Sequence, residues 1–452
     1  MGIVHEKYKQ LKPEMRYLCD EVVLAQAWKK THSYIRSHNW YADTLELDCS
    51  AVNLEECVKE WANALEEQTY IPDSMRMVLA PKSDHWTFYR NDEHSPWKWG
   101  PKQKDGKSGC KELRPLAHLS IQDQTIATAI MLCLADAVET EQGSTNPKDG
   151  GQVWSYGNRL FCDWKGGKAH FRWGNSNTYS KYFQDYQRFL ERPIKLAQKI
   201  QPALPPSVGI YEIHLDLSSF YDLIDRDELI RKLKIIAGDH YNTDKVQRNL
   251  FWKTVEIIID NLAWSEEDKN LAKYLKSGIN NDGQGLPQGM VASGFFANVY
   301  LIELDKMMSN KIGKSLGDVT LIDYCRYVDD MRLLVHVPFD CEPDDWKEWV
   351  KREIQPIVAK TEGMQLNTDK TKVERYTAKR SGVSVRMKAI QRAASGPQDL
   401  AALDEMQGSL EGIIALAEQF RDQRDLPHLD CDIPLAKIDQ PQMDVREDTI
   451  LR

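Results

Sequence analysis

The sequence of 452 residues contains no apolar run near the ~18 residues that a membrane-spanning helix needs, so it predicts no membrane span. Its N-terminal residues lack the apolar core of a secretory signal peptide. Nine cysteines occur without any Cys-x-x-Cys pair, which supports neither a zinc knuckle nor a disulfide framework. No internal repeat or low-complexity tract is visible. These absences indicate a cytoplasmic protein whose thiols are reduced.

An excess of positive charge is also lacking, since 59 Lys and Arg against 68 Asp and Glu give a net charge of −9. Such a balance is unfavourable for binding nucleic acid, because Lys and Arg bind the phosphates. The distribution of charge matters more than its average, however. Residues 377–398 contain no acid and carry Lys379, Arg380, Arg386, Lys388 and Arg392. We expect this segment to contact a nucleic-acid backbone; a basic surface helix is the alternative.

The composition, with 42% hydrophobic and 9% aromatic residues, is that of a globular protein with room for two or three subdomains. Within it, two adjacent acids, Asp329 and Asp330, lie between runs of β-branched and aromatic residues. That pattern predicts a strand, a tight turn that carries the acids, and a returning strand. Adjacent carboxylates repel each other unless solvent or a cation neutralises them. For this dipeptide alone, a solvated turn is the default interpretation.

A third acid, Asp216, is predicted at the carboxyl end of an earlier strand. Ile213, Leu215 and Leu217 alternate with a period of two, and a helix should begin near Asp225. Between the acid-bearing strands, residues 285–289 read Gly-Leu-Pro-Gln-Gly, which predicts a rigid turn that a ligand can approach closely. An apolar helical run follows this turn.

Together these motifs resemble those of a reverse transcriptase in their order and spacing. They comprise Asp216 with Tyr221 five residues later, the turn holding Gln288 with Ser293 and Asn298 beyond it, and Tyr327-Val328-Asp329-Asp330. A Ser-Tyr-Gly-Asn-Arg element at residues 155–159 resembles bacterial members, in particular retron and defence-associated enzymes. The resemblance covers roughly residues 76–376. It implies an α+β fold of the right-hand polymerase type.

The resemblance also implies an organisation into fingers, palm and thumb. We predict an N-terminal helical extension over residues 1–75, fingers over 76–205, a palm of antiparallel sheet and helices over 206–376, a helical thumb over 377–425 and an acidic tail over 426–452. An apolar stripe with spacings of three and four from Leu400 to Phe420 underlies the thumb assignment, although the same stripe could form a homo-oligomer.

Three further helices are predicted: an amphipathic one over residues 121–137, one over 180–201, and a buried one containing Trp252. Basic and aromatic residues alternate in residues 27–41. Such interleaving suits single-stranded RNA, whose bases stack on rings, but a core role for these aromatics is the alternative.

The resemblance implies two-metal nucleotidyl transfer to a 3′-hydroxyl. Two Mg2+ ions, for which Mn2+ could substitute, would be bound by Asp216, Leu217, Asp329 and Asp330. The catalytic set is Asp216, Asp329, Asp330 and Lys370. Lys370 would protonate the leaving pyrophosphate, and a charge on a surface turn is its alternative role.

The resemblance implies a nucleotide-binding set as well. Lys111 and Arg114 would clamp the triphosphate, although Lys111 could be only a loop charge. Tyr221 would exclude a 2′-hydroxyl, with a core tyrosine as the alternative. Gln288 would border the nucleotide pocket or simply make hydrogen bonds within its turn. Arg159 would bind the template backbone or brace the fingers.

The expected function is therefore that of an RNA-directed DNA polymerase that uses dNTPs, an RNA template or structured noncoding RNA, and a DNA product, in antiphage defence. One alternative is a template-independent or protein-primed DNA polymerase. Another is a noncatalytic RNA-binding scaffold, which the presence of all three carboxylates disfavours. No nuclease, integrase or ribonuclease H domain is expected, and this argues against a retroviral enzyme.

Overall fold

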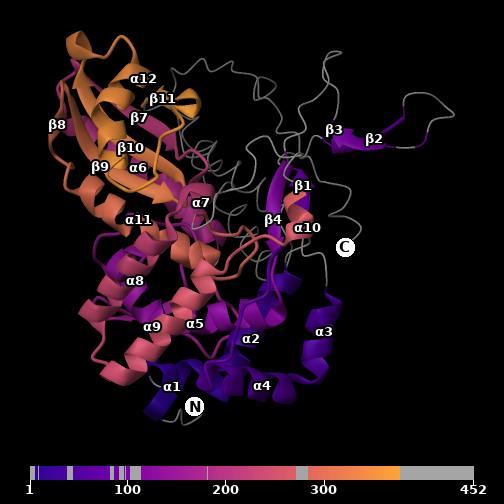
Figure 1. Cartoon of the computed structure of the whole chain (residues 1–452). Coiled ribbons are helices and arrows are strands. Elements are labelled where there is room, and N and C mark those ends of the chain that lie inside the picture. Colours follow the sequence, from indigo (N-terminus) through magenta and orange to yellow (C-terminus); the bar gives the residue numbers. More distant parts are fainter. Residues whose placement is uncertain are drawn as a thin grey trace, which may run out of the picture.

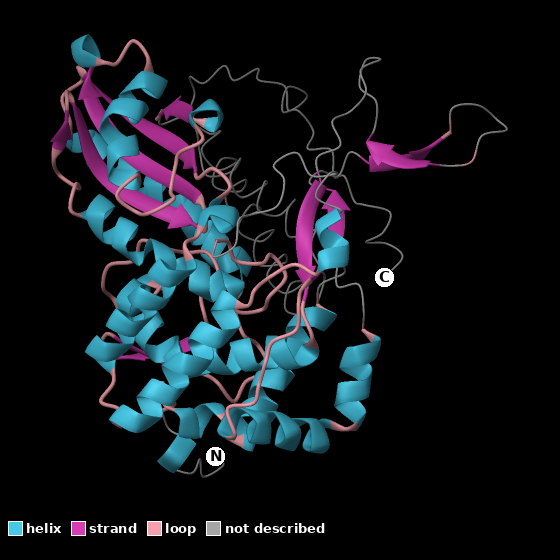
Figure 2. Cartoon of the chain, in the orientation of Figure 1, coloured by secondary structure: helices cyan, strands magenta, loops and turns pink. Residues whose placement is uncertain are grey.

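The computed structural model describes residues 6–8, 10–37, 44–81, 86–90, 96, 98–101, 113–180, 182–270 and 284–376. A layer of helices supports a five-stranded antiparallel sheet on one side and a two-stranded ribbon on the other (Figure 1). Figure 2 shows that helices dominate the base of the molecule. The α+β class predicted from the sequence is confirmed. The predicted thumb at 377–425 and tail at 426–452 lie outside the described residues.

The five-stranded sheet carries both of the acid-bearing strands as neighbours. Its strands in spatial order are β11 (Lys372–Arg375), β7 (Val208–Asp216), β10 (Asp330–Pro338), β9 (Val319–Tyr327) and β8 (Ser315–Leu316). Along β10 the side chains alternate between two hydrophobic clusters: Leu333 and Val335 belong to the main core, whereas Leu334 packs with Ala197 of α6 (Tyr182–Ile200). Because side chains alternate between the two faces of the sheet, this pattern sets the face on which each residue at the end of a strand lies.

The helical layer consists of α1 (Met15–Leu18), α2 (Glu21–Arg36), α3 (Leu45–Val52), α4 (Leu54–Glu66), α5 (Ile121–Gln142), α8 (Arg226–His240), α9 (Lys245–Asp260) and α11 (Ser293–Ser309). The helices predicted over 180–201, around Trp252 and after Asp225 are confirmed by α6, α9 and α8. Asp225 caps α8, because its carboxylate accepts the Glu228 N–H at 2.8 Å.

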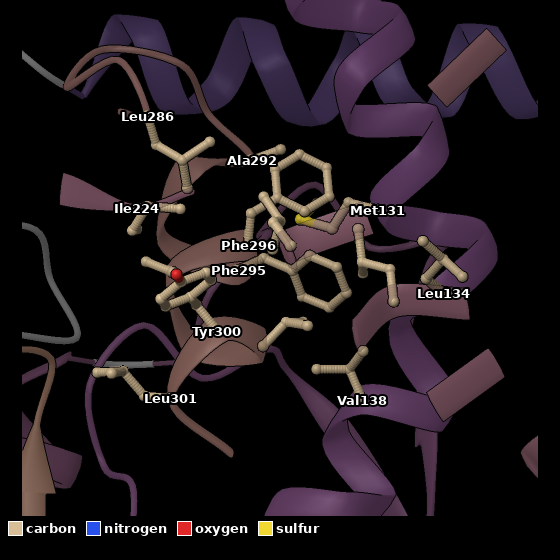
Figure 3. Close-up of a cluster of buried hydrophobic side chains, with 14 of the residues drawn as sticks. Met131, Leu134, Val138, Ile224, Leu286, Ala292, Phe295, Phe296, Tyr300 and Leu301 are labelled. Atoms are coloured by element: carbon tan, nitrogen blue, oxygen red, sulfur yellow. The ribbon is translucent and has the colours of Figure 1, made fainter. Parts of the chain in front are cut away.

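α5 is buried along almost its whole length and packs against α11. Figure 3 shows Phe295 and Phe296 of α11 beside Met131, Leu134 and Val138 of α5. The helix predicted over 121–137 is confirmed and begins at Ile121, but it extends to Gln142 and is buried rather than amphipathic.

Buried hydrogen bonds account for part of that error, because some polar residues of α5, among them Gln124 and Glu139, are paired inside the protein. Gln124 is fully buried and bonds Gly289 and Val291 through its amide. Glu139 is buried as well and pairs with Arg159. Polar side chains that look like a solvent face in the sequence are thus satisfied in the core.

The ribbon consists of β1 (Arg76–Pro81) and β4 (Leu113–His118), which pair antiparallel. It is held to α10 (Glu266–Lys269) by Asp268, whose carboxylate accepts from Arg76 Nε and from the Met77 N–H, both at 3.0 Å. Two further hairpins are β2 (Trp86–Tyr89) with β3 (Lys98–Pro101), and β5 (Cys162–Lys165) with β6 (Lys168–Phe171).

Short segments complete the described chain. They are η1 (Glu6–Tyr8), η2 (Pro147–Asp149), η3 (Gln201–Ala203), α7 (Phe220–Leu223), η5 (Phe339–Cys341), α12 (Trp346–Trp349), the π-helical η6 (Val350–Ile354), α13 (Gln355–Val358) and η7 (Thr368–Lys370). Among the described helices, none combines the length and the apolar character needed to cross a membrane.

The N-terminal helices share the main hydrophobic core with α5 and α9. The hydroxyls of Thr31 and Thr128 lie 3.0 Å apart between α2 and α5. Trp28 packs against this core and donates its indole N–H to Ser50 at 2.9 Å. These contacts favour the core interpretation of Trp28 over stacking on RNA.

Candidate active site

The register of the central strands brings two of the predicted acids opposite each other. Asp216 at the end of β7 and Asp330 at the start of β10 are direct cross-strand partners. Asp329 occupies the turn before Asp330, and its carbonyl accepts the Leu217 N–H at 3.3 Å. Three carboxylates therefore meet at one end of the sheet, as the resemblance implies.

The turn that carries Asp329 has a strained backbone. Val328 adopts a φ of +59°, which a β-branched residue rarely tolerates. Such a conformation costs on the order of 1–3 kcal/mol and persists only where the surroundings hold it in place. Here Arg326 contributes by donating from Nη1 to the Val328 carbonyl at 3.3 Å.

Arg326 is fully buried and organises a polar network beneath the turn. Its guanidinium pairs with Asp305, with Nε 2.8 Å from Oδ1 and Nη2 2.9 Å from Oδ2. It also donates from Nη1 to Asn298 Oδ1 at 2.9 Å. Tyr324 completes the pairing of Asp305 through a 2.9 Å hydrogen bond. A satisfied buried network of this kind gives the turn a rigid foundation.

The Ser-Tyr-Gly-Asn-Arg element at residues 155–159 packs directly against that turn. Ser155 pairs in parallel with Arg326, whose carbonyl accepts the Tyr156 N–H at 2.9 Å. Gly157 is so close that a Cβ there would lie 2.5 Å from Val328 Cγ2 and 2.6 Å from the Val328 nitrogen. The element therefore supports the position of the turn that carries Asp329.

Arg159 of the same element is a brace and does not face a template. Its side chain is 2% exposed, and Nη2 lies 2.7 Å from Glu139 Oε2. Nη1 donates to the Ser155 carbonyl at 2.6 Å. Because its guanidinium is buried and paired with Glu139, these contacts disfavour the predicted contact with nucleic acid and favour a bracing role within the protein.

The carboxylates repel each other strongly. Burial, and then the charge of Asp330, raises the pKa of Asp329 to about 6. Burial and the charge of Asp216 raise the pKa of Asp330. Lys370 Nζ lies 2.8 Å from Asp216 Oδ2, and this hydrogen bond raises the pKa of Lys370. Lys370 is thus brought to the site, where its charge offsets part of the repulsion.

A divalent cation fits this donor set. The described residues form no ready-made cage of three or more acidic, histidine or cysteine side chains. Mg2+ does not need one, because it uses one or two carboxylates together with waters and substrate phosphates. The oxygen donors of Asp216, Asp329 and Asp330 and their mutual repulsion both favour such an ion. Leu217 could contribute only its carbonyl, since its side chain is apolar and buried.

Two of the predicted nucleotide-binding residues are Tyr221, on α7, and Gln288, in the Gly-Leu-Pro-Gln-Gly turn, and a backbone hydrogen bond joins α7 to that turn. Tyr221 sits on α7, and its carbonyl accepts the N–H of Leu286 in the Gly-Leu-Pro-Gln-Gly turn at 2.8 Å. Gln288 is half-buried, and its carbonyl accepts the Ala117 N–H of β4 at 2.7 Å. Arg114 lies exposed on β4.

The remaining predicted contacts fall outside the described residues. They are Lys111, Lys379, Arg380, Arg386, Lys388 and Arg392.

Sequence reasoning missed Arg326, Asp305, Gln124 and Asn158. Asn158 donates to the Tyr221 hydroxyl at 3.3 Å, and Gln124 braces the rigid turn by bonding Gly289 at 2.8 Å. One signal was available: Arg326 is a charged residue inside an otherwise apolar strand pattern. Its partner lies outside the motif, so the pattern alone could not identify the pair.

Without divalent cations, the carboxylate cluster should destabilise the fold at neutral pH. The pKa of Asp329, about 6, exceeds the usual 3.8. Between about pH 4 and about pH 6 the folded protein therefore binds more protons than the unfolded chain, so stability falls as pH rises through this window. The free energy of unfolding at pH 7 is lower on this account by on the order of 1–3 kcal/mol.

Thermal melts in a chelator across this range would measure the effect. The Asp329→Asn variant should lose this part of the pH dependence and melt above the wild type at about pH 7. Equal melting temperatures for the two proteins at that pH would contradict the raised pKa.

An antiparallel sheet with three acids at one end is an arrangement that suits two-metal nucleotidyl transfer in a polymerase of the right-hand type. Residues 101–391 match the family model "Reverse transcriptase (RNA-dependent DNA polymerase)". The chain belongs to this family.

Two solved telomerase structures resemble the chain. Apo telomerase from Candida tropicalis, truncated from its C-terminal domain, has 14% identity and a TM-score of 0.33 over 73% of this chain and 57% of that one. Telomerase from Candida albicans with a TWJ fragment of telomeric RNA has 12% identity and a TM-score of 0.34 over 72% and 46%. The chain thus spans about half the length of these relatives. No curated protein matches its sequence.

Proposed function

We propose that this chain synthesises DNA on an RNA template by adding dNTPs to a 3′-hydroxyl. One observation carries the proposal: Asp216 and Asp330 are cross-strand partners at the sheet end, and Asp329 lies in the adjoining turn. This placement of two carboxylates on neighbouring strands and a third in the adjoining turn suits a site that must hold divalent ions and a triphosphate together.

The reverse transcriptase family generally uses divalent metal ions, and we propose two Mg2+ ions, with Mn2+ as a substitute. Bound to Asp216, Asp329 and Asp330, they would neutralise charge on the attacking hydroxyl and on the leaving pyrophosphate. Lys370, hydrogen-bonded to Asp216, is close enough to reach a phosphate bound at the same carboxylates. An ordinary lysine is already protonated at neutral pH, so Lys370 carries the proton that a general acid for pyrophosphate must donate.

The nucleotide would lie between this site and the ribbon. Arg114 is exposed on β4, where its guanidinium can contact the triphosphate. Gln288 is bonded to the same strand and would border the nucleotide. Tyr221 would lie under the sugar and exclude a 2′-hydroxyl. Burial, and then the negative charge of Asp329, raises the pKa of Tyr221.

The finer biological role is also a proposal. The element at residues 155–159 resembles that of retron and defence-associated enzymes, and it packs against the catalytic turn. We propose a cytoplasmic bacterial defence polymerase whose template is a noncoding RNA. The basic residues between Lys379 and Arg392 would contact the nucleic-acid backbone, and self-association is compatible with this role.

The test is polymerisation by the purified protein with the nucleic acid that it carries, using labelled dNTPs or NTPs and an Asp329→Ala control. DNA made only by the wild type would establish the reaction. A product complementary to a bound RNA would support templated synthesis, whereas random or homopolymeric DNA would favour untemplated extension. Failure to make product with Mg2+, Mn2+ and added cellular RNA would favour a noncatalytic scaffold.

Sugar selection provides a sharper test of the site. Tyr221→Ala should reduce the preference for dNTPs over NTPs by roughly 10- to 200-fold, because it opens space for the 2′-hydroxyl. The measurement is the ratio of kcat/KM for dGTP to that for GTP. An unchanged ratio would remove Tyr221 from sugar selection.

A further inference from the structure

The side chain of Tyr221 has a defined partner at its polar end. Asn158 Nδ2 donates to the Tyr221 hydroxyl at 3.3 Å. The two residues come from separate parts of the chain, since Asn158 follows Gly157 beside the catalytic turn and Tyr221 lies on the one-turn helix α7. Tyr221 is partly buried, so its ring is in a packed environment but not fully enclosed. A ring on so short a helix benefits from a second point of attachment.

Asn158 is itself held in an unusual conformation. Its φ is +50°, in the left-handed region that asparagine tolerates better than most residues. Asn298 Nδ2 donates to the carbonyls of Gly157 and Asn158 at 2.8 and 3.2 Å. A Cβ on Gly294 would lie 2.7 Å from the Asn158 amide. The absence of a side chain at Gly294 thus leaves room for the side chain that reaches Tyr221.

Asn298 connects this arrangement to the catalytic turn. It is 1% exposed, and its Oδ1 accepts from Arg326 Nη1 at 2.9 Å and from Ser155 Oγ at 3.1 Å. Arg326 also bonds the Val328 carbonyl in the turn before Asp329. A series of buried and partly buried hydrogen bonds through Arg326, Asn298 and Asn158 therefore joins the turn that carries Asp329 to the hydroxyl of Tyr221.

We propose that Asn158 is a positioning residue for sugar selection, because it fixes the ring of Tyr221 relative to the catalytic carboxylates. This inference rests on the proposed role of Tyr221 in excluding the 2′-hydroxyl. Asn158 does not touch the nucleotide. It restricts the tyrosine to the orientation in which the ring blocks the ribose, and Asn298 holds the backbone from which Asn158 acts.

The decisive variant is Asn158→Gly. Glycine adopts a φ of +50° without strain, so the change removes the amide and leaves the backbone conformation accessible. A net hydrogen bond shifts an equilibrium by about five- to tenfold, and we expect the dGTP to GTP ratio of kcat/KM to fall by that factor. Asn158→Asp should retain most of the preference, because its carboxylate can accept a hydrogen bond that the tyrosine hydroxyl donates.

The Tyr221→Phe variant gives an independent measurement, because it removes the acceptor of the same hydrogen bond. It keeps the ring and removes only the hydroxyl, so it should reduce the ratio by a similar factor. In the double variant, Asn158→Gly should add nothing further, because both changes remove the same interaction. An unchanged ratio in Tyr221→Phe would overturn the proposal even if Asn158→Gly did not fold.

Other outcomes would overturn the inference as well. An equal loss of kcat/KM for both nucleotides in Asn158→Gly would mean a purely structural role, and additive effects in the double variant would mean that Asn158 acts elsewhere. The Tyr221→Ala variant distinguishes the proposed role of Tyr221 in sugar selection from the proposed role of Asn158 in positioning Tyr221. If Tyr221→Ala relaxes selection while Asn158→Gly does not, only the role of Asn158 fails; if neither does, the role of Tyr221 fails too.

Discussion

DNA synthesis should fall by at least ~10³-fold in the Asp329→Asn variant, while the protein remains folded. Bound metal ions contribute several kcal/mol of transition-state stabilisation, and each 1.4 kcal/mol is a factor of ten in rate. Asn has nearly the shape of Asp but none of its charge, so the loss measures the carboxylate. The fold should survive, because the raised pKa of Asp329 means that its charge is already unfavourable in the folded state.

The matched control is Asp318→Asn. Asp318 is exposed in the turn before β9, at the opposite end of the strand that leads to Asp329. The two variants are compared in primer extension with labelled dNTPs and Mg2+. A thermal melt of each variant checks that it is folded. If Asp329→Asn retained synthesis comparable to Asp318→Asn, the metal site would have to be assigned to other residues.

Gly157→Ala should reduce DNA synthesis by about 10²-fold or more without removing any catalytic group. The new Cβ would lie 2.5 Å from Val328 Cγ2 and 2.6 Å from the Val328 nitrogen, so the turn or the segment must move. A displacement of about 1 Å can cost a factor of 10² when reacting groups are misplaced. The backbone of Gly157 lies outside the left-handed region, so alanine adds no conformational strain of its own.

Gly174→Ala is the corresponding control, because a Cβ on Gly174 would have nothing within 4 Å. Both variants should be assayed for primer extension and for binding of the primer and template. Loss of extension with retained binding would place the effect at the carboxylates. Full activity in Gly157→Ala would show that the Val328 turn can shift without consequence, and the supporting role of the 155–159 element would then be wrong.

Local patterns predicted the parts of the site whose signals are local. The alternation of Ile213 and Leu215 predicts a strand ending at Asp216, and the acids at 329 and 330 predict a turn between strands. Both features are present, as are the helices around Trp252 and after Asp225.

Features that depend on distant partners could not be predicted in this way. Arg159 looks like an available cation until Glu139, from a different helix, is placed beside it. Arg326 and Asp305 likewise pair across elements, and Gln124 bonds a turn far along the chain. For the same reason, the polar residues of α5 suggested a solvent-facing side. A charged residue that looks exposed in the sequence can be buried when a residue from a distant segment pairs with it. The local sequence pattern does not identify that partner.

The pairing of Asp216 with Asp330 has a consequence for the timing of biosynthesis. These residues are more than one hundred positions apart, and the strands that carry them become neighbours only after β10 has been made. Contacts of such separation form late, because the entropy of closing the intervening loop must be overcome first. A chain still emerging from the ribosome, or one cut between these strands and separated, therefore lacks the carboxylate pair. The pair can therefore form only after translation has passed the turn that carries Asp329.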